Sequence, residues 1–256
     1  MSKRAKKIFG QHFLKNKAIV EQILEAFDPG ELPVLEIGPG MGVLSFDLYE
    51  KYGERYKAVE VDRDMIDYLK GENPFIEKHL IHKDFLKLNL QEISSQPFAV
   101  IGNFPYNISS QIIFKIIESD VEVPLIVGMF QKEMAQRLIS GEGSKIYGVT
   151  SVLTALFYEG EYLFDIGPKN FAPPPKIMSG VIRLKRKNIL GPGMPSYKQI
   201  KTVVKMAFGQ RRKTLRNSLK PLLIEKSVDS DDAVFNLRPE QLSVRDFIAL
   251  TEKLYA

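Results

Sequence analysis

The sequence predicts an α/β fold, in which a mostly parallel sheet with an antiparallel edge strand precedes a small all-α domain. Two observations support this prediction. Short apolar runs typical of buried strands alternate with helix-spaced apolar residues up to about residue 187, as in chains built from βα units. Beyond a Gly- and Pro-rich segment at 188–195, only helical patterns remain. We therefore expect a sheet domain over residues 1–187 and a helical domain over residues 196–256.

The first expected elements lead into a glycine turn. A helix is predicted over residues 16–27 by its apolar face, and Asp28-Pro29-Gly30 ends it. A strand at 33–37 then runs into Gly38-Pro39-Gly40-Met41-Gly42, and a further helix follows. Strand, glycine turn and helix form the opening of a Rossmann-like nucleotide-binding unit. Glycines there let the backbone approach a ligand at the amino end of the helix.

The remaining elements follow from the same patterns. Further strands are expected at residues 56–61, 80–82, 98–101, 124–130, 158–166 and 179–185, the last of them antiparallel at the edge of the sheet. A serine-capped helix is expected at Ser109, and other helices near 131–140 and 151–157. In the last domain, leucines at 215, 219, 222 and 223 form one helix face and basic residues at 212, 216 and 220 form another. Two more helices are expected, one from about residue 229 and one capped by Ser243.

Acidic residues next to three strands indicate the ligand. Glu60 comes about twenty residues after the glycine turn, where an acid can accept both ribose hydroxyls of an adenosine. Asp84 can accept from an adenine amino group, although capping a helix would also explain it. Glu36 adjoins the turn, where it would repel a pyrophosphate and attract a cationic sulfonium. The turn also lacks the third glycine of G-x-G-x-x-G, so S-adenosylmethionine is favoured over NAD as the ligand.

The stretch Asn103-Phe104-Pro105-Tyr106 follows the strand expected at 98–101. It therefore lies at the carboxyl end of a strand, where open α/β sheets bind ligands. The asparagine supplies an amide oxygen, the proline turn supplies a backbone carbonyl, and the tyrosine supplies an aromatic face. Together these groups suit the planar amino group of a nucleobase. A proline turn whose tyrosine covers the core is the alternative interpretation.

Composition limits the classes of protein and of partner. The chain of 256 residues has no Cys and three His, which excludes disulfides, thiolate metal sites and a His-rich metal cluster. The net charge is +5, with basic residues gathered in two acid-free segments, 3–7 and 196–220. Such segments indicate a polyanionic partner, with solvated helix faces as the alternative. A bilayer-spanning run and a signal peptide are both missing from the sequence, so we expect a cytoplasmic protein.

Seven motifs, in their order along the chain, resemble the KsgA-type family of ribosomal RNA adenine dimethyltransferases. The motifs are Phe9-Gly-Gln-His-Phe-Leu14, Glu36-Ile-Gly-Pro-Gly40, Asn103-Phe-Pro-Tyr106, Gln131-Lys-Glu133, Gly143-Ser-Lys-Ile-Tyr-Gly148, Phe171-Ala-Pro-Pro-Pro-Lys-Ile-Met-Ser179 and Gln210-Arg-Arg-Lys-Thr-Leu-Arg-Asn-Ser-Leu219. Each motif alone is weak, whereas their shared order is specific. The resemblance covers nearly the whole chain.

The resemblance implies a methyltransferase domain that binds S-adenosylmethionine, followed by a small helical RNA-binding domain. It implies dimethylation of N6 on two adjacent adenines near the 3′ end of 16S rRNA, within the immature 30S subunit, by a monomer that needs no metal. By position in the motifs, donor contacts would fall on His12, Leu14, Gly38, Glu60, Asp84 and Asn103. Catalysis would fall on Asn103, Phe104, Pro105 and Tyr106, and RNA contacts on Phe171, Arg211, Arg212 and Lys213.

Two positions depart from the family's pattern. His12 stands where the first motif usually has Asn, and it can still donate or accept one hydrogen bond. Phe104 stands where Leu or Ile is usual. Its larger ring could narrow the base pocket, although its backbone carbonyl is unaffected.

The expected mechanism starts from the N6 lone pair, which is delocalised into the adenine ring. The Asn103 side-chain oxygen and a backbone carbonyl at Phe104 or Pro105 would accept the two amino hydrogens. These bonds would turn the lone pair toward the methyl carbon of the donor. Tyr106 would stack on one face of an extruded base, and Phe171 would cover the other face.

Other functions share parts of this pattern. An Erm-type enzyme would methylate an adenine of 23S rRNA in the large subunit, but the motif at 210–219 and the proline loop argue against it. An assembly factor would bind immature subunits with catalysis secondary, and both roles could coexist. A DNA N6-adenine methyltransferase would have Asn-Pro-Pro-Tyr, and position 104 is not proline. An NAD enzyme is the remaining alternative.

Overall fold

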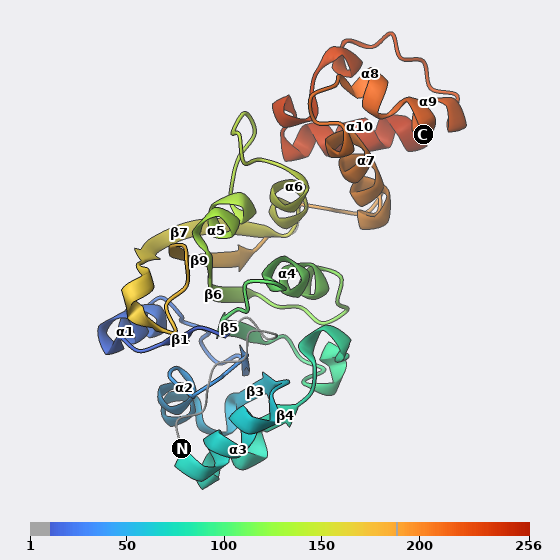
Figure 1. Cartoon of the computed structure of the whole chain (residues 1–256). Coiled ribbons are helices and arrows are strands. Elements are labelled where there is room, and N and C mark those ends of the chain that lie inside the picture. The colour runs from blue at the N-terminus through green and yellow to red at the C-terminus, as the bar shows by residue number, and fades with distance from the viewer. Residues whose placement is uncertain (1–10, 188) are drawn as a thin grey trace. The chain divides into compact units, whose positions relative to one another are not determined.

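The computed structural model describes residues 11–187 and 189–256, and the chain divides into two compact units (Figure 1). One unit holds the residues up to Ala135 together with Gly160–Arg186. The other holds Gln136–Glu159 together with the residues from Lys187 on. Residues 136–159, which the sequence analysis assigns to the sheet domain, are thus part of the helical unit. The basic residues Lys3, Arg4, Lys6 and Lys7 lie outside the described residues.

A seven-stranded sheet forms the framework of the first unit, with the strand order β4-β3-β2-β5-β6-β9-β7. The strands are β2 (Val34–Ile37), β3 (Tyr56–Glu60), β4 (Leu80–His82), β5 (Ala99–Asn103), β6 (Leu125–Gln131), β7 (Tyr158–Ile166) and β9 (Ser179–Arg186). The first five strands in that order run parallel, and β9 runs antiparallel to β6. The predicted Rossmann-like α/β architecture is confirmed.

The edge of the sheet differs from the prediction. Residues 179–185 do not form the edge, because β7 lies outside β9. Val181, Ile182 and Leu184 of β9 are completely buried, as expected of an interior strand. The middle residues of β7, in contrast, are exposed or partly exposed.

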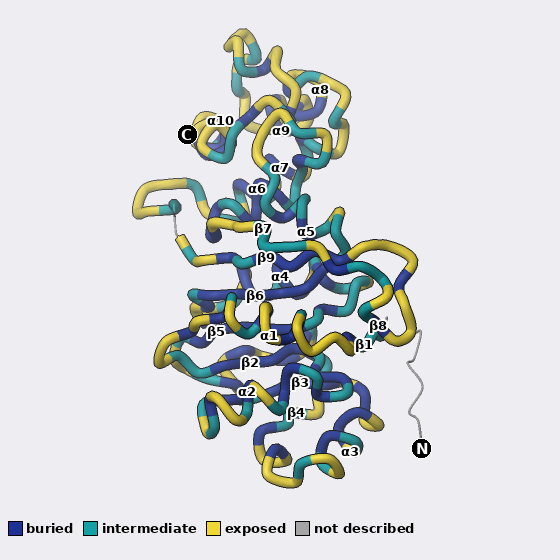
Figure 2. Tube along the Cα trace, turned by 90° about the vertical axis from the view of Figure 1, so that its left-hand side faces the viewer, coloured by how far each residue is buried: buried dark blue, intermediate teal, exposed yellow. Residues whose placement is uncertain are grey.

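Helices α1 (Lys17–Glu25) and α2 (Ser45–Tyr52) pack on the sheet. Val20 and Ile23 of α1 and Leu48 of α2 share one buried cluster with side chains of β2 and β3. The start of α1 agrees with the sequence, since the Asn16 side chain accepts from Ala18 N at 3.1 Å. The further helices are α3 (Arg63–Glu72), α4 (Ser109–Ile117) and α5 (Lys132–Leu138). Figure 2 shows that the central strands β2, β5 and β6 are buried for most of their length.

A two-stranded sheet, which the sequence did not reveal, joins distant parts of the first unit. Strand β1 (Phe13–Leu14) pairs antiparallel with β8 (Phe171–Ala172), and Leu14 stands opposite Phe171. Next to this pair, Lys15 N donates to Asn170 O at 2.9 Å. The segment that carries His12 is thereby held against the proline-rich loop.

The second unit is helical and contains α6 (Val149–Ala155), α7 (Tyr197–Gly209), α8 (Leu215–Ser218), α9 (Lys220–Glu225) and α10 (Val244–Tyr255). The leucines at 215, 219, 222 and 223 are buried, as predicted. The helix predicted to carry the basic residues 212, 216 and 220 on one face is divided in the structure. Arg212 lies in the turn at 210–213 that follows α7, Arg216 lies in α8, and Lys220 begins α9. A short 3₁₀ turn (Ala233–Asn236) replaces the helix expected from residue 229, and Ser243 caps α10 as expected.

Residues 136–159 belong to the second unit because the loop at 141–148 is tied to its helices. Tyr147 OH donates to Leu242 O at 2.9 Å, and its ring meets that of Phe208 edge-on at 5.9 Å. Gly143 N donates to Glu240 O at 2.8 Å. These contacts join residues that are far apart in sequence, which explains why composition shifts alone misplaced them. Within the part of the chain that the structure describes, every helix is too short or too polar to cross a membrane.

Candidate functional site

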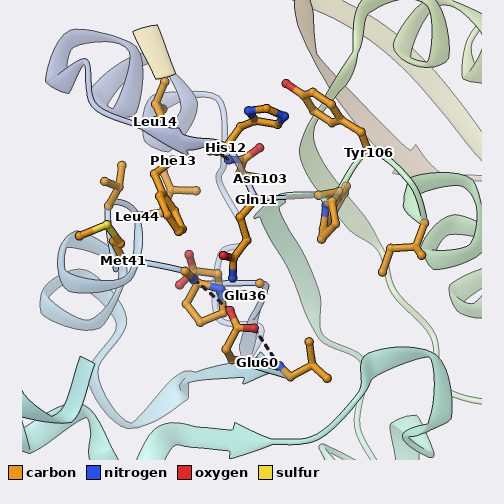
Figure 3. A pocket seen from close by; sticks show the side chains of 18 of the residues that line it. Gln11, His12, Phe13, Leu14, Glu36, Met41, Leu44, Glu60, Asn103 and Tyr106 are labelled. Atoms are coloured by element: carbon orange, nitrogen blue, oxygen red, sulfur yellow. Dashed lines mark hydrogen bonds between the residues drawn. The ribbon is translucent and has the colours of Figure 1, made fainter. Parts of the chain in front are cut away.

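A cavity of about 240 Å³ opens at the carboxyl ends of β2, β3 and β5 (Figure 3). This is the edge at which open α/β sheets bind ligands. The residues predicted for the donor and for catalysis all border it: His12, Leu14, Gly38, Glu60, Asp84, Asn103, Phe104, Pro105 and Tyr106. The predicted RNA contacts are not among its lining residues: Phe171, Arg211, Arg212 and Lys213.

The Glu60 carboxylate is held by backbone N–H groups beside the glycine turn. Its Oε1 accepts from Val61 N at 2.8 Å and from Asp62 N at 2.9 Å, and its Oε2 accepts from Gly40 N at 3.1 Å. A carboxylate oxygen offers about two lone pairs, so Oε2 has room for one further donor. The geometry thus leaves room for one ribose hydroxyl, where the sequence analysis expects two.

Two further acids border the cavity. Glu36 is 1% exposed, and its Oε2 accepts from Ser45 Oγ at 2.7 Å and from Tyr56 OH at 2.6 Å. Burial raises the pKa of this carboxyl to about 7, although the two hydrogen bonds act in the opposite direction. Asp84 caps a turn by accepting from Leu86 N at 3.0 Å, so the capping interpretation holds while its side chain also borders the cavity.

The Asn103 amide is oriented by a backbone contact. Its Nδ2 donates to His12 O at 2.8 Å. Among the described residues the side-chain oxygen Oδ1 has no such partner, so it is the amide atom left to accept from a ligand. The Tyr106 ring lies in the same loop, with its hydroxyl 2.5 Å from Ser179 Oγ. Ser109, which we expected to cap α4, instead donates to Tyr106 O at 3.3 Å. These contacts fix the loop that carries Asn103 and Tyr106.

Residues 11–14 form one wall of the cavity. Gln11 Nε2 donates to Asp62 Oδ2 at 3.0 Å, and His12 Nδ1 lies 2.8 Å from Pro173 O. The sequence analysis missed Gln11 and Pro173 as individual contributors, because these contacts join residues 51 and 161 positions apart. The wall therefore depends on parts of the chain that only the fold brings together.

Comparison with known proteins decides the family. The family model described as ribosomal RNA adenine dimethylase matches residues 2–247. The chain belongs to the ribosomal RNA adenine dimethylase family. As a ribosomal RNA adenine dimethylase it is an S-adenosylmethionine-dependent methyltransferase, which confirms the enzyme class and the methyl donor expected from the sequence.

Relatives and solved structures agree with this assignment. The chain is 49% identical to the ribosomal RNA small subunit methyltransferase A of Bacteroides thetaiotaomicron, over 98% of this chain and 94% of that protein. It is 47% identical to the protein of the same name from Flavobacterium johnsoniae, over 99% and 97%. A dimethyladenosine transferase from Plasmodium falciparum matches with a TM-score of 0.74 and 25% identity, over 94% and 96%. The 23S rRNA methyltransferase ErmE matches with a TM-score of 0.65 and 25% identity, over 95% and 100%.

In this dimethylase the Phe104 ring points into the interior. The residue is completely buried, and its ring centroid lies 5.0 Å from that of Phe130. The space comes from Gly128 on β6, where an added Cβ would lie 2.3 Å from Phe104 Cε2. The larger ring therefore does not narrow the cavity, contrary to the expectation from the sequence.

Phe171, which the sequence analysis expects to cover the base, does not border the cavity. Phe171 is 1% exposed, stands opposite Leu14 in the β1–β8 pair and belongs to the core cluster of the dimethylase. The ring is thus part of the core and not of the cavity lining. The ring that faces Tyr106 is that of His12, and the two ring centroids are 5.5 Å apart.

Of the three basic residues predicted to contact RNA, Arg211 already has partners inside the second unit of the dimethylase. Its Nη1 donates to Lys145 O at 2.7 Å and its Nη2 to Ser144 O at 3.0 Å. The guanidinium therefore stabilises the loop at 141–148. Arg212 and Lys213 are exposed on the turn that follows α7, and they remain the candidates for phosphate contacts.

Proposed function

We propose that this chain dimethylates N6 of two adjacent adenines near the 3′ end of 16S rRNA, within the immature 30S subunit, as a monomer in the cytoplasm. The observation that supports the adenine chemistry is the Asn103 amide, whose oxygen is left to accept a hydrogen bond beside the Tyr106 ring. The choice of small-subunit rRNA rests on relatives named ribosomal RNA small subunit methyltransferase A, at up to 49% identity.

The amino group of adenine is a poor nucleophile, because its lone pair is delocalised into the ring. Asn103 Oδ1 and the backbone carbonyl at Phe104 or Pro105 accept the two N6 hydrogens and direct the lone pair toward the donor's methyl carbon. The nitrogen–methyl bond forms as the sulfur–methyl bond breaks, and N6 then loses a proton to water. Correct placement of the two reactants can supply about 7–11 kcal/mol of the rate enhancement. Tyr106 stacks on the extruded base.

The second methylation explains why residue 103 is an amide. After one transfer N6 has a single hydrogen, so one acceptor must lose its bond, and a neutral amide loses it at a lower cost than a carboxylate. The contact with His12 adds a second reason. Aspartate at 103 would lack the Nδ2–H donor and would place a carboxylate oxygen against the His12 carbonyl, which is 2.8 Å from Nδ2.

The cavity residues fit S-adenosylmethionine, which supplies an activated methyl group on a cationic sulfur. Glu60 Oε2 has room for one ribose hydroxyl, and Asp84 borders the cavity as an acceptor for the adenine amino group. Glu36 contributes a negative charge when ionised. The three acidic residues expected to bind the methyl donor therefore match a nucleoside that carries a positive charge.

Donor affinity should depend on pH through Glu36. With its pKa raised to about 7 by burial, this carboxyl is protonated below that pH, and its attraction for the sulfonium is then lost. The dissociation constant of S-adenosylmethionine should rise by up to about tenfold per pH unit as the pH falls below 7, measured by calorimetry. S-adenosylhomocysteine, whose sulfur is neutral, should show a flatter profile. Glu36→Gln should remove the difference between the two ligands, and a difference that persists would exclude Glu36 as its source.

Exposed cations on the second unit should account for part of the RNA affinity. The double variant Arg212→Gln/Lys213→Gln should weaken binding to immature small subunits, and it should lower the slope of log K against log salt by roughly 1.5. Filter binding over a salt series measures this slope. Lys70→Gln is the matched control, because its ammonium is already paired with Glu77 at 2.8 Å. A slope that stays unchanged in the double variant would contradict the phosphate assignment.

Labelled-methyl transfer tests the proposed substrate. The enzyme is given immature small subunits, free 16S rRNA and large subunits in parallel, and the modified bases are mapped. We expect two dimethylated adenines near the 3′ end of 16S rRNA in the small subunits. Label in 23S rRNA would support the Erm-type alternative. Tight binding to small subunits without transfer would support the assembly-factor alternative.

A further inference from the structure

We propose that three lysines beside the β1–β8 pair, Lys15, Lys17 and Lys169, bind phosphates of the RNA strand that enters the site. We call these residues the ribbon lysines. This inference rests on the proposed function, since it assigns a binding surface to the RNA that the enzyme methylates. The ribbon lysines belong to the first unit, and they lie outside the two basic segments, 3–7 and 196–220, that the sequence analysis associates with a polyanion.

Hydrogen bonds at the end of the β1–β8 pair bring the ribbon lysines together. Asn16 Nδ2 donates to Asn170 Oδ1 at 2.8 Å, although the two residues are 154 positions apart in the sequence. Lys15 N donates to Asn170 O at 2.9 Å. Lys15 and Lys17 flank Asn16 in the chain. Lys169 comes directly before Asn170, so every ribbon lysine adjoins this bonded pair. Figure 2 shows β1 and β8 side by side, with exposed segments, drawn in yellow, next to them.

Neighbouring acids do not neutralise the ribbon lysines. All three are exposed, and among the described residues none of them forms an ion pair with a carboxylate. The first turn of α1, which begins at Lys17, contains no acidic residue. Five other surface lysines of the same unit do form an ion pair with a Glu or an Asp: Lys70, Lys78, Lys83, Lys87 and Lys132. The ribbon lysines can therefore bind a polyanion without first breaking an ion pair.

The ribbon lysines lie close to the cavity that is expected to receive the base. Phe13 and Leu14 border the cavity, and Lys15 follows them directly. His12 O accepts from the Asn103 amide at 2.8 Å. Because an extended chain spans at most about 3.6 Å per residue, Lys15 lies within about 11 Å of His12. An adenine that leaves its stack to reach Asn103 brings its own phosphates to this edge. Contacts from the ribbon lysines would position these phosphates without reading the sequence.

Removal of the three charges tests this surface. Lys15→Gln/Lys17→Gln/Lys169→Gln should bind immature small subunits roughly 10- to 100-fold more weakly at about 0.15 M salt. It should lower the slope of log K against log salt by about 2, since each contact to a single strand contributes about 0.7. Lys15→Arg/Lys17→Arg/Lys169→Arg should stay within about threefold of the unmodified enzyme, because the charges remain. In both variants kcat at saturating subunits and the dissociation constant of S-adenosylmethionine should change by less than about threefold, because the ribbon lysines do not border the cavity.

A second triple variant controls for net charge. Lys70→Gln/Lys78→Gln/Lys83→Gln removes the same three positive charges from lysines that are already paired with glutamates. It should change the salt slope by less than about 0.5. An equal loss of affinity in this control would show that binding follows net charge alone, and it would overturn the inference.

Filter binding to small subunits and to free 16S rRNA, with calorimetry for the donor, distinguishes the remaining outcomes. An unchanged salt slope in the glutamine variant of the ribbon lysines would exclude the phosphate contacts. A loss on small subunits without a loss on free 16S rRNA would assign the surface to an acidic protein of the subunit. A loss of donor affinity as large as the loss of RNA affinity would make the ribbon lysines structural. Failure of the unmodified enzyme to methylate small subunits would instead remove the proposed function, so the two failures are distinguishable.

Discussion

Asn103→Ala is expected to lower methyl transfer by on the order of 1000-fold or more, because it removes an acceptor that acts on the reacting nitrogen itself. Donor binding should weaken only a few-fold, since the other donor contacts remain. The variant also loses the hydrogen bond from Asn103 Nδ2 to His12 O. The loss of this contact accounts for the small decrease in affinity for S-adenosylmethionine. Single-turnover transfer of labelled methyl measures the first quantity, and calorimetry with S-adenosylmethionine measures the second.

Asn103→Asp tests the contribution of the Nδ2 hydrogen-bond donor. It keeps the size of the side chain and an oxygen for N6, but it has no donor for the His12 carbonyl. We expect a strong loss in the first transfer and a larger loss in the second, which would appear as accumulated monomethyladenine in mapped products. Near-normal turnover by Asn103→Ala would remove Asn103 from the mechanism.

Gly128→Ala should be among the most destabilising single-methyl additions in the sheet. A Cβ at this position would lie 2.3 Å from Phe104 Cε2 and 2.8 Å from Phe130 Cε2, at the centre of a buried aromatic pair. Overpacking of this kind costs about 3 kcal/mol of unfolding free energy, or more where the neighbours cannot move. Chemical denaturation at constant m-value measures the loss.

A smaller side chain at position 104 should restore part of the unfolding free energy that Gly128→Ala loses. Phe104→Leu alone leaves a cavity, but in the Gly128→Ala background the smaller side chain makes room for the new methyl group. The double variant should therefore be more stable than the sum of the single effects by about 1–3 kcal/mol. Gly141→Ala is the matched control, because no atom of the described residues lies within 4 Å of its added Cβ, and it should change stability by less than about 0.5 kcal/mol. Strict additivity in the double variant would show that residues 104 and 128 do not compete for space.

Most of the sheet could be predicted because each strand has its own local signal. Apolar runs such as those of β2 and β6 end at a turn or a polar residue, and length and composition then distinguish them from helices. The order of β7 and β9 could not be read in this way. Which of two successive strands pairs with β6 depends on contacts between distant residues, and the acidic residues at 159, 161 and 165 of β7 were the available local sign.

The sequence predicts those residues of the site that lie at the ends of strands. Glu60 and Asn103 are the last residues of parallel strands, and Glu36 is the last but one of another. These strand ends meet at one edge of the sheet, so the proximity of the three residues follows from topology. The surroundings of Phe171 and Arg211 do not follow, because each depends on a partner elsewhere in the chain. Phe171 is buried by its pairing with Leu14, and Arg211 bonds a loop 66 residues away. A motif that resembles a family's motif therefore does not determine where its side chain points.

The pairing of β1 with β8 has a consequence for biosynthesis. Phe13–Leu14 leaves the ribosome early, and its partner Phe171–Ala172 is made 158 residues later. At a synthesis rate of about 5–20 residues per second the interval is roughly 8–30 s. For most of that interval, from residue 42 on, the nascent chain has its glycine turn but lacks the partner that closes the wall. Ligand capture during translation must therefore wait until well past the middle of the polypeptide, however early the first half folds.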